Sequence, residues 1–169
     1  MERIIIIGCG GSGKSTLATR LGEKLSLPVY HLDRMFWRSG WNELPRDEWH
    51  TLHEELCARP EWILDGNYGG TREVRFAACD TIIFLDLPTV TCLFGAIQRF
   101  LWFRGRNRPD MADGCPERLE WEYLRWIWTD RRDCRPKILA RLKELAATKQ
   151  VVILLSRQAA RQYLKSKPG

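Results

Sequence analysis

The sequence has no apolar run of the roughly 20 residues that a membrane-spanning helix requires. Its longest apolar runs are short and have the length of buried strands: they are residues 4–7, 81–85 and 151–155. The chain also passes from Met1 through two charged residues into a strand-like run, which leaves no room for the apolar part of a secretion signal. We therefore expect no membrane partner and a cytoplasmic location.

The sequence also lacks the cysteine and histidine spacings of a metal centre. None of its six cysteines forms a Cys-x-x-Cys pair, which excludes a zinc ribbon. Disulfides are not expected in a reducing compartment, and Cys57, Cys79 and Cys92 are interpreted as small apolar residues. His50 and His53 lie three residues apart on an expected helix. Because a third ligand is missing, we interpret them as part of its solvated face.

Long disordered or low-complexity segments are absent as well. Hydrophobic residues make up 44% of the chain and charged residues 28%, which is typical of a globular protein. A length of 169 residues predicts one domain, spanning residues 1–169. The 27 basic and 21 acidic residues leave a net charge of +6. This charge favours anionic partners such as nucleotides, phosphorylated metabolites or nucleic acid.

Segments of strand type alternate with segments of helical period along the chain. Five strands are expected, at residues 3–7, 29–32, 62–64, 81–85 and 151–155. Helices are expected at residues 14–25, 47–58, 89–103, 117–132 and 136–148, followed by a last helix capped by Ser156. The alternation predicts an α/β fold in which helices cover both faces of a parallel sheet. Ligands then bind at the carboxyl ends of the strands.

The strongest motif follows the first strand and opens the first helix. Residues 8–15 read Gly-Cys-Gly-Gly-Ser-Gly-Lys-Ser, which matches the phosphate-binding loop G-x-x-x-x-G-K-[ST]. Glycines and a helix N-terminus direct backbone amides at a phosphate. Lys14 is expected to reach the β- and γ-phosphates of ATP, and Ser15 to bind Mg²⁺. The expected nucleotide-binding residues are Gly8, Gly10, Gly11, Ser12, Gly13, Lys14, Ser15 and Thr16, with Arg157 as a further contact near the base.

Acidic residues follow three of the other expected strands. Asp65 is predicted to hold Mg²⁺ through water beside the loop, with a turn-capping role as the alternative; Asp86 is the runner-up for the metal. Asp33 ends the second strand on the acceptor side. Its carboxylate would orient or deprotonate a substrate hydroxyl, and a helix-capping role is the alternative.

An arginine-rich segment with glycines and prolines follows the fourth strand and its helix. We expect residues 100–135, approximately, to form a helical lid that excludes water and stabilises the transferring phosphate, a solvated basic surface being the alternative. The chain also has eight tryptophans, interpreted as core or lid residues, or as an aromatic floor for a ring substrate. The candidate catalytic arginines are Arg99, Arg104, Arg106 and Arg108.

These motifs together resemble the small P-loop kinases of the adenylate kinase and shikimate kinase group. The resemblance implies a three-layer P-loop NTPase fold with a five-stranded parallel sheet of order 2-3-1-4-5. Adenylate kinases carry Asp-Gly-Phe-Pro-Arg where this chain has Asp-Gly-Asn-Tyr at residues 65–68. The difference argues against AMP as the acceptor. The implied substrate-binding residues are Asp33, Gly66, Asn67 and Tyr68, with Arg72 in place of the missing arginine.

The chain is also similar, over nearly its full length, to the subgroup called DNA topology modulation proteins. The shared pattern comprises His-Leu-Asp at 31–33, Gly-Trp at 40–41, Trp-Ile-Leu-Asp-Gly-Asn-Tyr at 62–68 and Phe-Leu-Asp-Leu-Pro at 84–88. The name of the subgroup implies a link to DNA and no particular reaction.

The resemblance implies Mg²⁺-dependent transfer of the γ-phosphoryl group of ATP to a small molecule. The acceptor would be a nucleoside, a nucleotide or a hydroxyl-bearing metabolite. The alternative function is that of a nucleotide-dependent, DNA-associated regulatory protein. The basic charge favours weak, non-specific binding to nucleic acid, but the sequence has no DNA-reading motif. We expect a monomer or a weak dimer.

Overall fold

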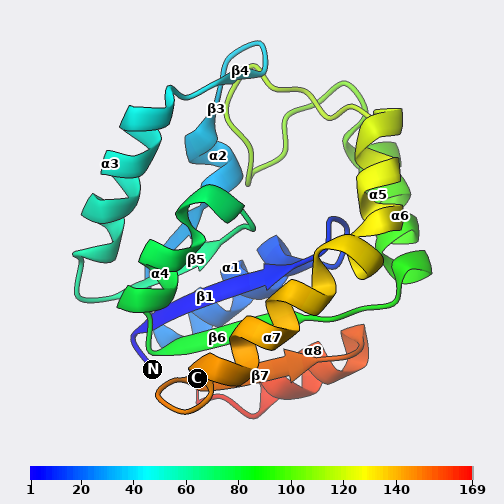
Figure 1. The fold of residues 1–169 in the computed structure, drawn as a ribbon. Coiled ribbons are helices and arrows are strands. Elements are labelled where there is room, and N and C mark those ends of the chain that lie inside the picture. Colours follow the sequence, from blue (N-terminus) through cyan, green and yellow to red (C-terminus); the bar gives the residue numbers. More distant parts are fainter. Residues whose placement is uncertain (169) are drawn as a thin grey trace.

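A computed structural model of the chain describes residues 1–168, and Gly169 lies outside the described residues. Its main sheet contains β1 (Arg3–Gly8), β2 (Val29–His31), β5 (Trp62–Asp65), β6 (Thr81–Leu85) and β7 (Gln150–Leu154). The longer helices are α1 (Lys14–Leu25), α3 (Arg46–Cys57), α5 (Thr89–Phe103), α6 (Trp121–Asp133), α7 (Arg135–Leu145) and α8 (Arg157–Lys165). Figure 1 shows helices on both sides of this sheet, with α5 and α6 side by side at one end.

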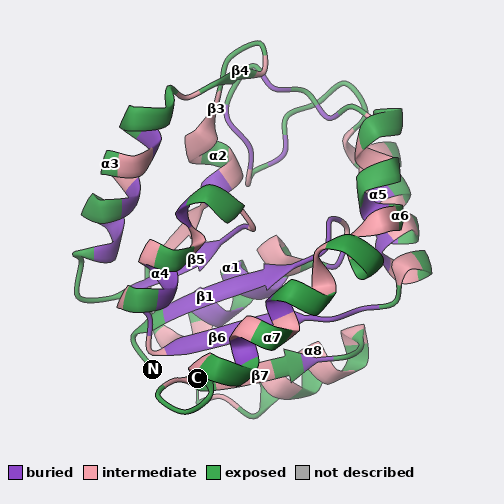
Figure 2. Cartoon of the chain, in the orientation of Figure 1, coloured by how far each residue is buried: buried purple, intermediate pink, exposed green. Residues whose placement is uncertain are grey.

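The five strands run parallel in the order β2-β5-β1-β6-β7. Counted within this sheet, that is the expected order 2-3-1-4-5, so the predicted α/β class and topology are confirmed. In the central strand, Ile6 lies beside Asp65 of β5 and Ile83 of β6. The three inner strands are buried on both faces (Figure 2), as their continuous apolar sequences predict.

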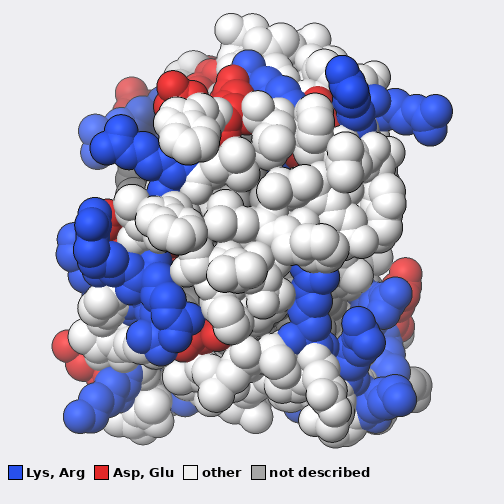
Figure 3. All heavy atoms as spheres, turned by 90° about the vertical axis from the view of Figure 1, so that its right-hand side faces the viewer, with Lys and Arg blue, Asp and Glu red and all other residues white. Residues whose placement is uncertain are grey.

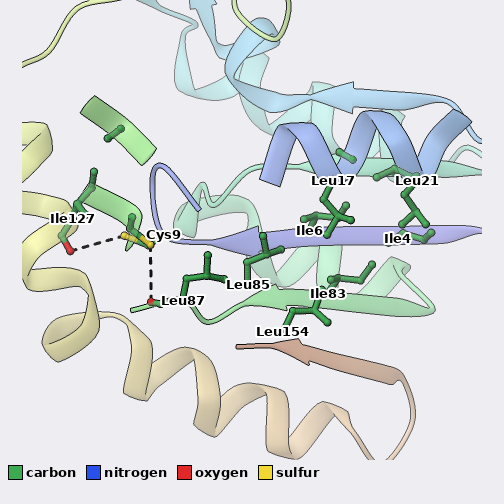
Figure 4. Packing of buried hydrophobic residues seen from close by; sticks show 14 residues of the cluster. Ile4, Ile6, Cys9, Leu17, Leu21, Ile83, Leu85, Leu87, Ile127 and Leu154 are labelled. Carbon is green, nitrogen blue, oxygen red and sulfur yellow. Dashed lines mark hydrogen bonds between the residues drawn. The ribbon is translucent and has the colours of Figure 1, made fainter. Parts of the chain in front are cut away.

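Two hydrophobic clusters fix the helices to the two faces of the sheet. On one face, Leu17 and Leu21 of α1 pack with Ile4 and Ile6 of β1 (Figure 4), and residues of α8 extend this cluster. The alternate isoleucines of β1 face the opposite cluster, which α3, α4 (Arg72–Ala78) and α7 cover. The carboxyl end of β1, where the glycine-rich loop begins, is therefore held by packing on both sides.

Five short elements were not expected from the sequence. They are α2 (Leu32–Phe36), the antiparallel hairpin of β3 (Trp37–Arg38) and β4 (Asn42–Glu43), the 3-10 turn η1 (Gly69–Thr71), and α4. None exceeds seven residues, which is too short to show a clear period. The prediction that Asp33 ends a strand is wrong, because β2 ends at His31 and Asp33 lies in α2.

The helix that was expected at residues 117–132 also has different boundaries. α6 begins at Trp121, four residues later than expected. Glu117 instead pairs with the chain at Arg104, and its carboxylate is buried among arginines. At the last helix the prediction is confirmed, since the Ser156 hydroxyl accepts a hydrogen bond of 3.0 Å from the Ala159 amide.

His53 is buried, so its interpretation as part of a solvated helix face is wrong. Its Nδ1 lies 2.9 Å from the Trp49 carbonyl oxygen, and its Nε2 lies 3.1 Å from the Thr71 hydroxyl. Burial lowers the pKa of His53 to about 4, so the ring is neutral at ordinary pH. His53 therefore joins α3 to the turn before α4.

None of the helices within residues 1–168 combines enough length with enough apolar character to cross a bilayer. All six cysteines are free thiols in the described chain, and Cys57, Cys79 and Cys92 are buried as expected.

Candidate active site

A cavity of about 970 Å³ lies beside the glycine-rich loop. The loop residues from Gly10 to Thr16 line it, together with Asp33, Asp65 and Arg157. Residues 66–68 and two of the candidate arginines, Arg99 and Arg108, line it as well. The structure thus brings most of the residues selected from the sequence to one place.

The phosphate-binding loop packs directly against α5 and α6. Gly11 has φ 73°, and a Cβ at this position would overlap the backbone of Cys92 in α5. A Cβ on Gly10 would overlap the hydroxyl of Tyr123 in α6. Lys14 Nζ donates a hydrogen bond of 3.0 Å to the Cys9 carbonyl oxygen within the loop. Only glycine fits at position 11, because its neighbours are backbone atoms, and the loop therefore lies in direct contact with α5.

Two buried oxygen atoms of the cavity lining have no hydrogen-bond partner among residues 1–168. They are the hydroxyl oxygen of Ser12 and Oδ1 of Asp65. A buried polar atom without a partner costs about 1–3 kcal/mol, so such atoms favour a ligand. A hydroxyl suits a phosphate oxygen, and a carboxylate oxygen suits a water of Mg²⁺. The donor set, with Ser15 also lining the cavity, fits a nucleotide with its metal ion.

The second oxygen of Asp65 is held by His31, whose Nδ1 lies 2.9 Å away. Although burial alone would lower it, this hydrogen bond raises the pKa of His31 above its usual value. Asp86 instead forms two hydrogen bonds with Arg135, of 2.6 and 2.7 Å, and does not line the cavity. The geometry therefore favours Asp65 over Asp86 as the metal-binding acid.

Asp33 and Tyr68 meet in the wall of the cavity. The Tyr68 hydroxyl donates a hydrogen bond of 2.7 Å to Asp33 Oδ1. Burial, followed by the charge of Asp33, raises the pKa of Tyr68, so the phenol stays protonated. His31, not Asp33, occupies the N-cap of α2, so Asp33 does not have the capping role that was its alternative. Its second carboxylate oxygen can accept a hydrogen bond from a ligand.

Arg75 holds the segment that carries Asn67 and Tyr68, and sequence reasoning missed it. Its fully buried side chain donates hydrogen bonds of 2.8, 2.6 and 2.8 Å to the carbonyl oxygens of Gly66, Asn67 and Tyr68. No carboxylate in the described chain forms an ion pair with it, and burial lowers its pKa to about 10. The only signal in the sequence was an arginine within an apolar stretch.

Glu117 joins two of the four candidate arginines. Its side chain is 2% exposed, and Oε1 accepts a hydrogen bond of 2.8 Å from Arg99 Nε. Its Oε2 lies 2.7 Å from Arg108 Nε, and Arg108 Nη1 lies 3.3 Å from Asp110. Although burial acts in the opposite direction, Arg108 and a hydrogen bond from Ser15 lower the pKa of Asp110. Asp110 and Glu117 were not selected from the sequence.

Four of the selected residues lie outside the cavity. Arg104 and Arg106 are exposed on the loop between α5 and α6. Arg72 begins α4 and does not line the cavity, and Gly8 lies beneath the loop, where it hydrogen-bonds to Asn67. Arg157 begins α8 and contacts the loop, with 3.5 Å between Nη2 and the Gly11 carbonyl oxygen. The functional roles of all these residues stay predictions.

Comparison with known proteins gives matches to kinases. No protein-family model matches the chain. Shikimate kinase from Limosilactobacillus fermentum (strain NBRC 3956 / LMG 18251) is 35% identical over 79 residues. The match covers 40% of this chain and 45% of that protein, so the chain spans less than half the length of this curated relative.

Two solved structures match nearly the whole chain. A gluconokinase from Sinorhizobium meliloti 1021 has a TM-score of 0.55 and 14% identity, covering 97% of this chain and 87% of that one. Shikimate kinase from Acinetobacter baumannii in complex with shikimate has a TM-score of 0.57 and 19% identity, covering 98% and 89%. These likenesses show that the protein has the α/β fold of the P-loop kinases.

Proposed function

We propose that the protein is an ATP-dependent phosphotransferase that phosphorylates a hydroxyl group of a small molecule. The observation that carries this proposal is that the phosphate-binding loop and Asp33 line the same cavity. A protein that only senses nucleotide has no need of a carboxylate in the wall of its phosphate site. The similarity to shikimate kinase and gluconokinase supports the same reaction class.

The glycine-rich loop would hold the triphosphate of ATP through its backbone amides, with Lys14 on the β- and γ-phosphates. Arg157, at the edge of the same cavity, is a further nucleotide contact. Ser15 and Asp65 would hold Mg²⁺. When bound, this ion neutralises charge on the phosphate oxygens.

Asp33 would act on the acceptor. The acceptor oxygen forms a bond to the γ-phosphorus while the bond from this phosphorus to the bridging β–γ oxygen breaks, and ADP leaves. The hydroxyl proton passes to the Asp33 carboxylate. Tyr68 fixes the orientation of that carboxylate through its hydrogen bond. Gly66 and Asn67 belong to the same segment and shape the acceptor side.

The lid would supply Arg99 and Arg108 to the transferring phosphoryl group, where negative charge accumulates on the oxygens. Arg104 and Arg106 lie outside the cavity and are secondary candidates. The DNA-associated alternative has less support, because Glu117 binds two of the four arginines inside the lid. Similarity to the topology modulation subgroup and a cytoplasmic location remain part of this proposal.

Two variants test the proposal. Lys14→Ala should abolish ATP binding measured by calorimetry, because it removes the side chain that reaches the β- and γ-phosphates. Asp33→Asn should leave ATP affinity nearly unchanged and lower transfer to the acceptor by about 10² or more. If Asp33→Asn weakens ATP binding as much as Lys14→Ala does, Asp33 belongs to the nucleotide site and the proposed acceptor side is wrong.

A further inference from the structure

A second, smaller cavity adjoins the phosphate site and has a different lining. We call it the acceptor recess; its volume is about 330 Å³. It extends to Trp37 and Trp41 of the β3–β4 hairpin. The residues that it shares with the larger cavity are Asp33, Tyr68, Arg99, Arg108, Tyr123 and Trp126. The recess therefore leads away from the phosphate-binding loop and begins at the carboxylate proposed to receive the acceptor hydroxyl.

Aromatic rings form much of the wall of the acceptor recess. Trp37 and Trp41 meet edge to face with 5.4 Å between ring centroids, and Trp37 also packs edge to face on Phe36. On the lid side, Tyr123 and Trp126 stack with 6.0 Å between centroids. Rings that are held by one another form a preorganised surface for a flat, apolar ring.

The cations of the acceptor recess are all paired with carboxylates. Arg99 and Arg108 are bound to Glu117, and Arg108 is also paired with Asp110. Arg118 pairs with Glu120 at 3.1 Å and lies over the Trp41 ring, 4.3 Å from its centroid. Arg99 Nη2 also donates a hydrogen bond of 3.3 Å to the Tyr123 hydroxyl, and both arginines line the phosphate cavity as well as the recess.

The charges that line the recess sum to zero, with three arginines against Asp33, Glu117 and Glu120. A phosphate or carboxylate on the acceptor would lose its hydration without meeting an unpaired cation, and it would approach the charge of Asp33. A hydroxyl group would instead donate to Asp33 at no such cost. The recess thus selects against anionic acceptors.

We propose that the acceptor is an uncharged, hydroxyl-bearing ring compound, such as a nucleoside, whose ring lies between the hairpin tryptophans and Trp126. This inference rests on the proposed function and narrows its substrate class. A ring seated in the recess would present its hydroxyl group to Asp33, next to the phosphate cavity. Nucleoside monophosphates and sugar acids are then poor acceptors.

Matched pairs of acceptors test the inference. Transfer of label from γ-labelled ATP would be measured for nucleosides against their 5′-monophosphates, and for neutral ring alcohols against shikimate and gluconate. The expected result is a kcat/KM at least tenfold higher for the uncharged member of a pair. Preferred transfer to the anionic members would overturn the inference and leave the proposed kinase intact. If no compound of either kind accepts label, the proposed function fails and the inference fails with it.

Variants of the recess give a second readout. Trp41→Leu should lower kcat/KM for the ring acceptor by about tenfold or more, because stacking on one aromatic ring contributes about 1–3 kcal/mol. The KM for ATP should stay the same. Leu155→Ala, at an exposed apolar residue that follows β7 and lines neither cavity, is the control and should change neither constant. Equal effects of the two substitutions would contradict the assignment of the recess.

A separate observation concerns the outer surface of α5 and α6, which we call the α5–α6 face. Figure 3 shows this side of the molecule with a broad area free of charged side chains. The exposed apolar residues of α5 include Val90, Phe94, Ile97 and Leu101, and those of α6 include Trp121 and Trp128. Proteins that stay monomeric rarely expose contiguous apolar patches of more than a few hundred Å².

Spacing and size indicate what covers this face. The α5 residues follow one another at intervals of four, three and four, which is the seam of a two-helix coiled coil. Phe94, Trp121 and Trp128 are 60%, 74% and 66% exposed. With about 150–250 Å² for an aromatic side chain, these three alone present on the order of 400 Å², and the aliphatic residues extend this towards the roughly 800 Å² per partner of a standard interface.

We infer that the α5–α6 face binds a second copy of this chain through a two-fold contact of α5 with α5. Isologous dimers of this kind are the commonest soluble assemblies. A membrane surface is the rival occupant, because membrane-binding helices carry Lys and Arg beside the apolar face and Figure 3 shows basic side chains around this area. The single basic residue within α5, Arg99, is turned inward to Glu117.

Sedimentation and light scattering over a range of protein concentration test this second inference. Wild-type protein should show twice the chain mass of 19.8 kDa at the higher concentrations. The double substitution of Phe94→Glu and Leu101→Glu should give a monomer that keeps the wild-type circular dichroism spectrum. A wild-type monomer up to about 100 µM, or a monomer that binds lipid vesicles, would overturn the inference.

Discussion

The Asn67 side chain forms hydrogen bonds with both backbone groups of Gly8, its N–H and its C=O. The Gly8 amide donates a hydrogen bond of 3.1 Å to Asn67 Oδ1, and Asn67 Nδ2 donates one of 2.9 Å to the Gly8 carbonyl oxygen. The two residues are 59 positions apart in the chain. This pair ties the start of the phosphate-binding loop to the segment that carries Tyr68, so the nucleotide side and the acceptor side of the cavity share one support.

Substitution of Asn67 should affect both stability and nucleotide binding. Asn67→Leu leaves both polar groups of Gly8 without their partner, which should lower the free energy of unfolding by about 1–3 kcal/mol. ATP affinity should fall as well. Asn67→Asp keeps the acceptor and loses the donor, so we expect an intermediate effect. Urea unfolding measures the change, and an unaltered midpoint for Asn67→Leu would contradict the role of this pair.

Arg75 should not tolerate replacement by lysine. A lysine ammonium group cannot reach three carbonyl oxygens with the planar geometry of a guanidinium group. We expect Arg75→Lys to lower the free energy of unfolding by about 2–4 kcal/mol. Arg141→Lys is the matched control, because Arg141 is exposed and pairs with Glu73 at the surface. If both variants unfold at the same denaturant concentration as the wild type, the hydrogen bonds of Arg75 to residues 66–68 do not stabilise the fold.

His53 should make the fold sensitive to acid. Its pKa of about 4 in the folded protein is below the ordinary value of 6.5, so the unfolded chain binds the proton first. The contribution of neutral His53 is complete above pH 6.5 and is lost as the pH falls towards 4. About 3 kcal/mol of stability should disappear over this interval. His53→Gln, which keeps a neutral polar side chain, should flatten the pH dependence of the free energy of unfolding in this interval. If the curves of the wild type and the variant run parallel, His53 is not the group responsible.

Glu117 should matter for transfer more than for ATP binding. Glu117→Gln leaves Arg99 and Arg108 facing one another without the buried charge that holds them. We expect kcat to fall by about 10–10² while the KM for ATP changes little. Glu122→Gln, on the exposed surface of α6, is the control and should have no effect. An unchanged kcat for Glu117→Gln would remove the lid arginines from the proposed mechanism.

The parts of the fold that could be predicted from the sequence depend on local signals. Ile4 to Ile7 form a continuous apolar run, and glycines follow at once, so a buried strand and its loop can be recognised without the rest of the molecule. The parts that were missed depend on distant partners. α6 begins at Trp121 and not at Glu117, because the Glu117 carboxylate is paired with Arg99 and Arg108. Arg75 and His53 appear polar in the sequence, and only the folded chain supplies their partners.

The acceptor side shows the same division. The position of Asp33 at the cavity was predicted, since strand ends in a parallel sheet meet at one edge. Its place in α2 and its hydrogen bond with the Tyr68 hydroxyl were not predicted. A helix of only five residues shows no clear period in the sequence. Arg104 and Arg106 were selected with Arg99 and Arg108 by composition alone. Composition does not distinguish the two arginines that pair with Glu117, Arg99 and Arg108, from the two that are exposed.

The most direct test of the account is transfer of label from γ-labelled ATP to a panel of hydroxyl-bearing small molecules, with wild-type protein, Lys14→Ala and Asp33→Asn run side by side. The account predicts a labelled organic product with the wild type. It predicts none with Lys14→Ala, and a yield lower by about 10² or more with Asp33→Asn. Release of inorganic phosphate alone, or equal yields of labelled product from all three proteins, would contradict it.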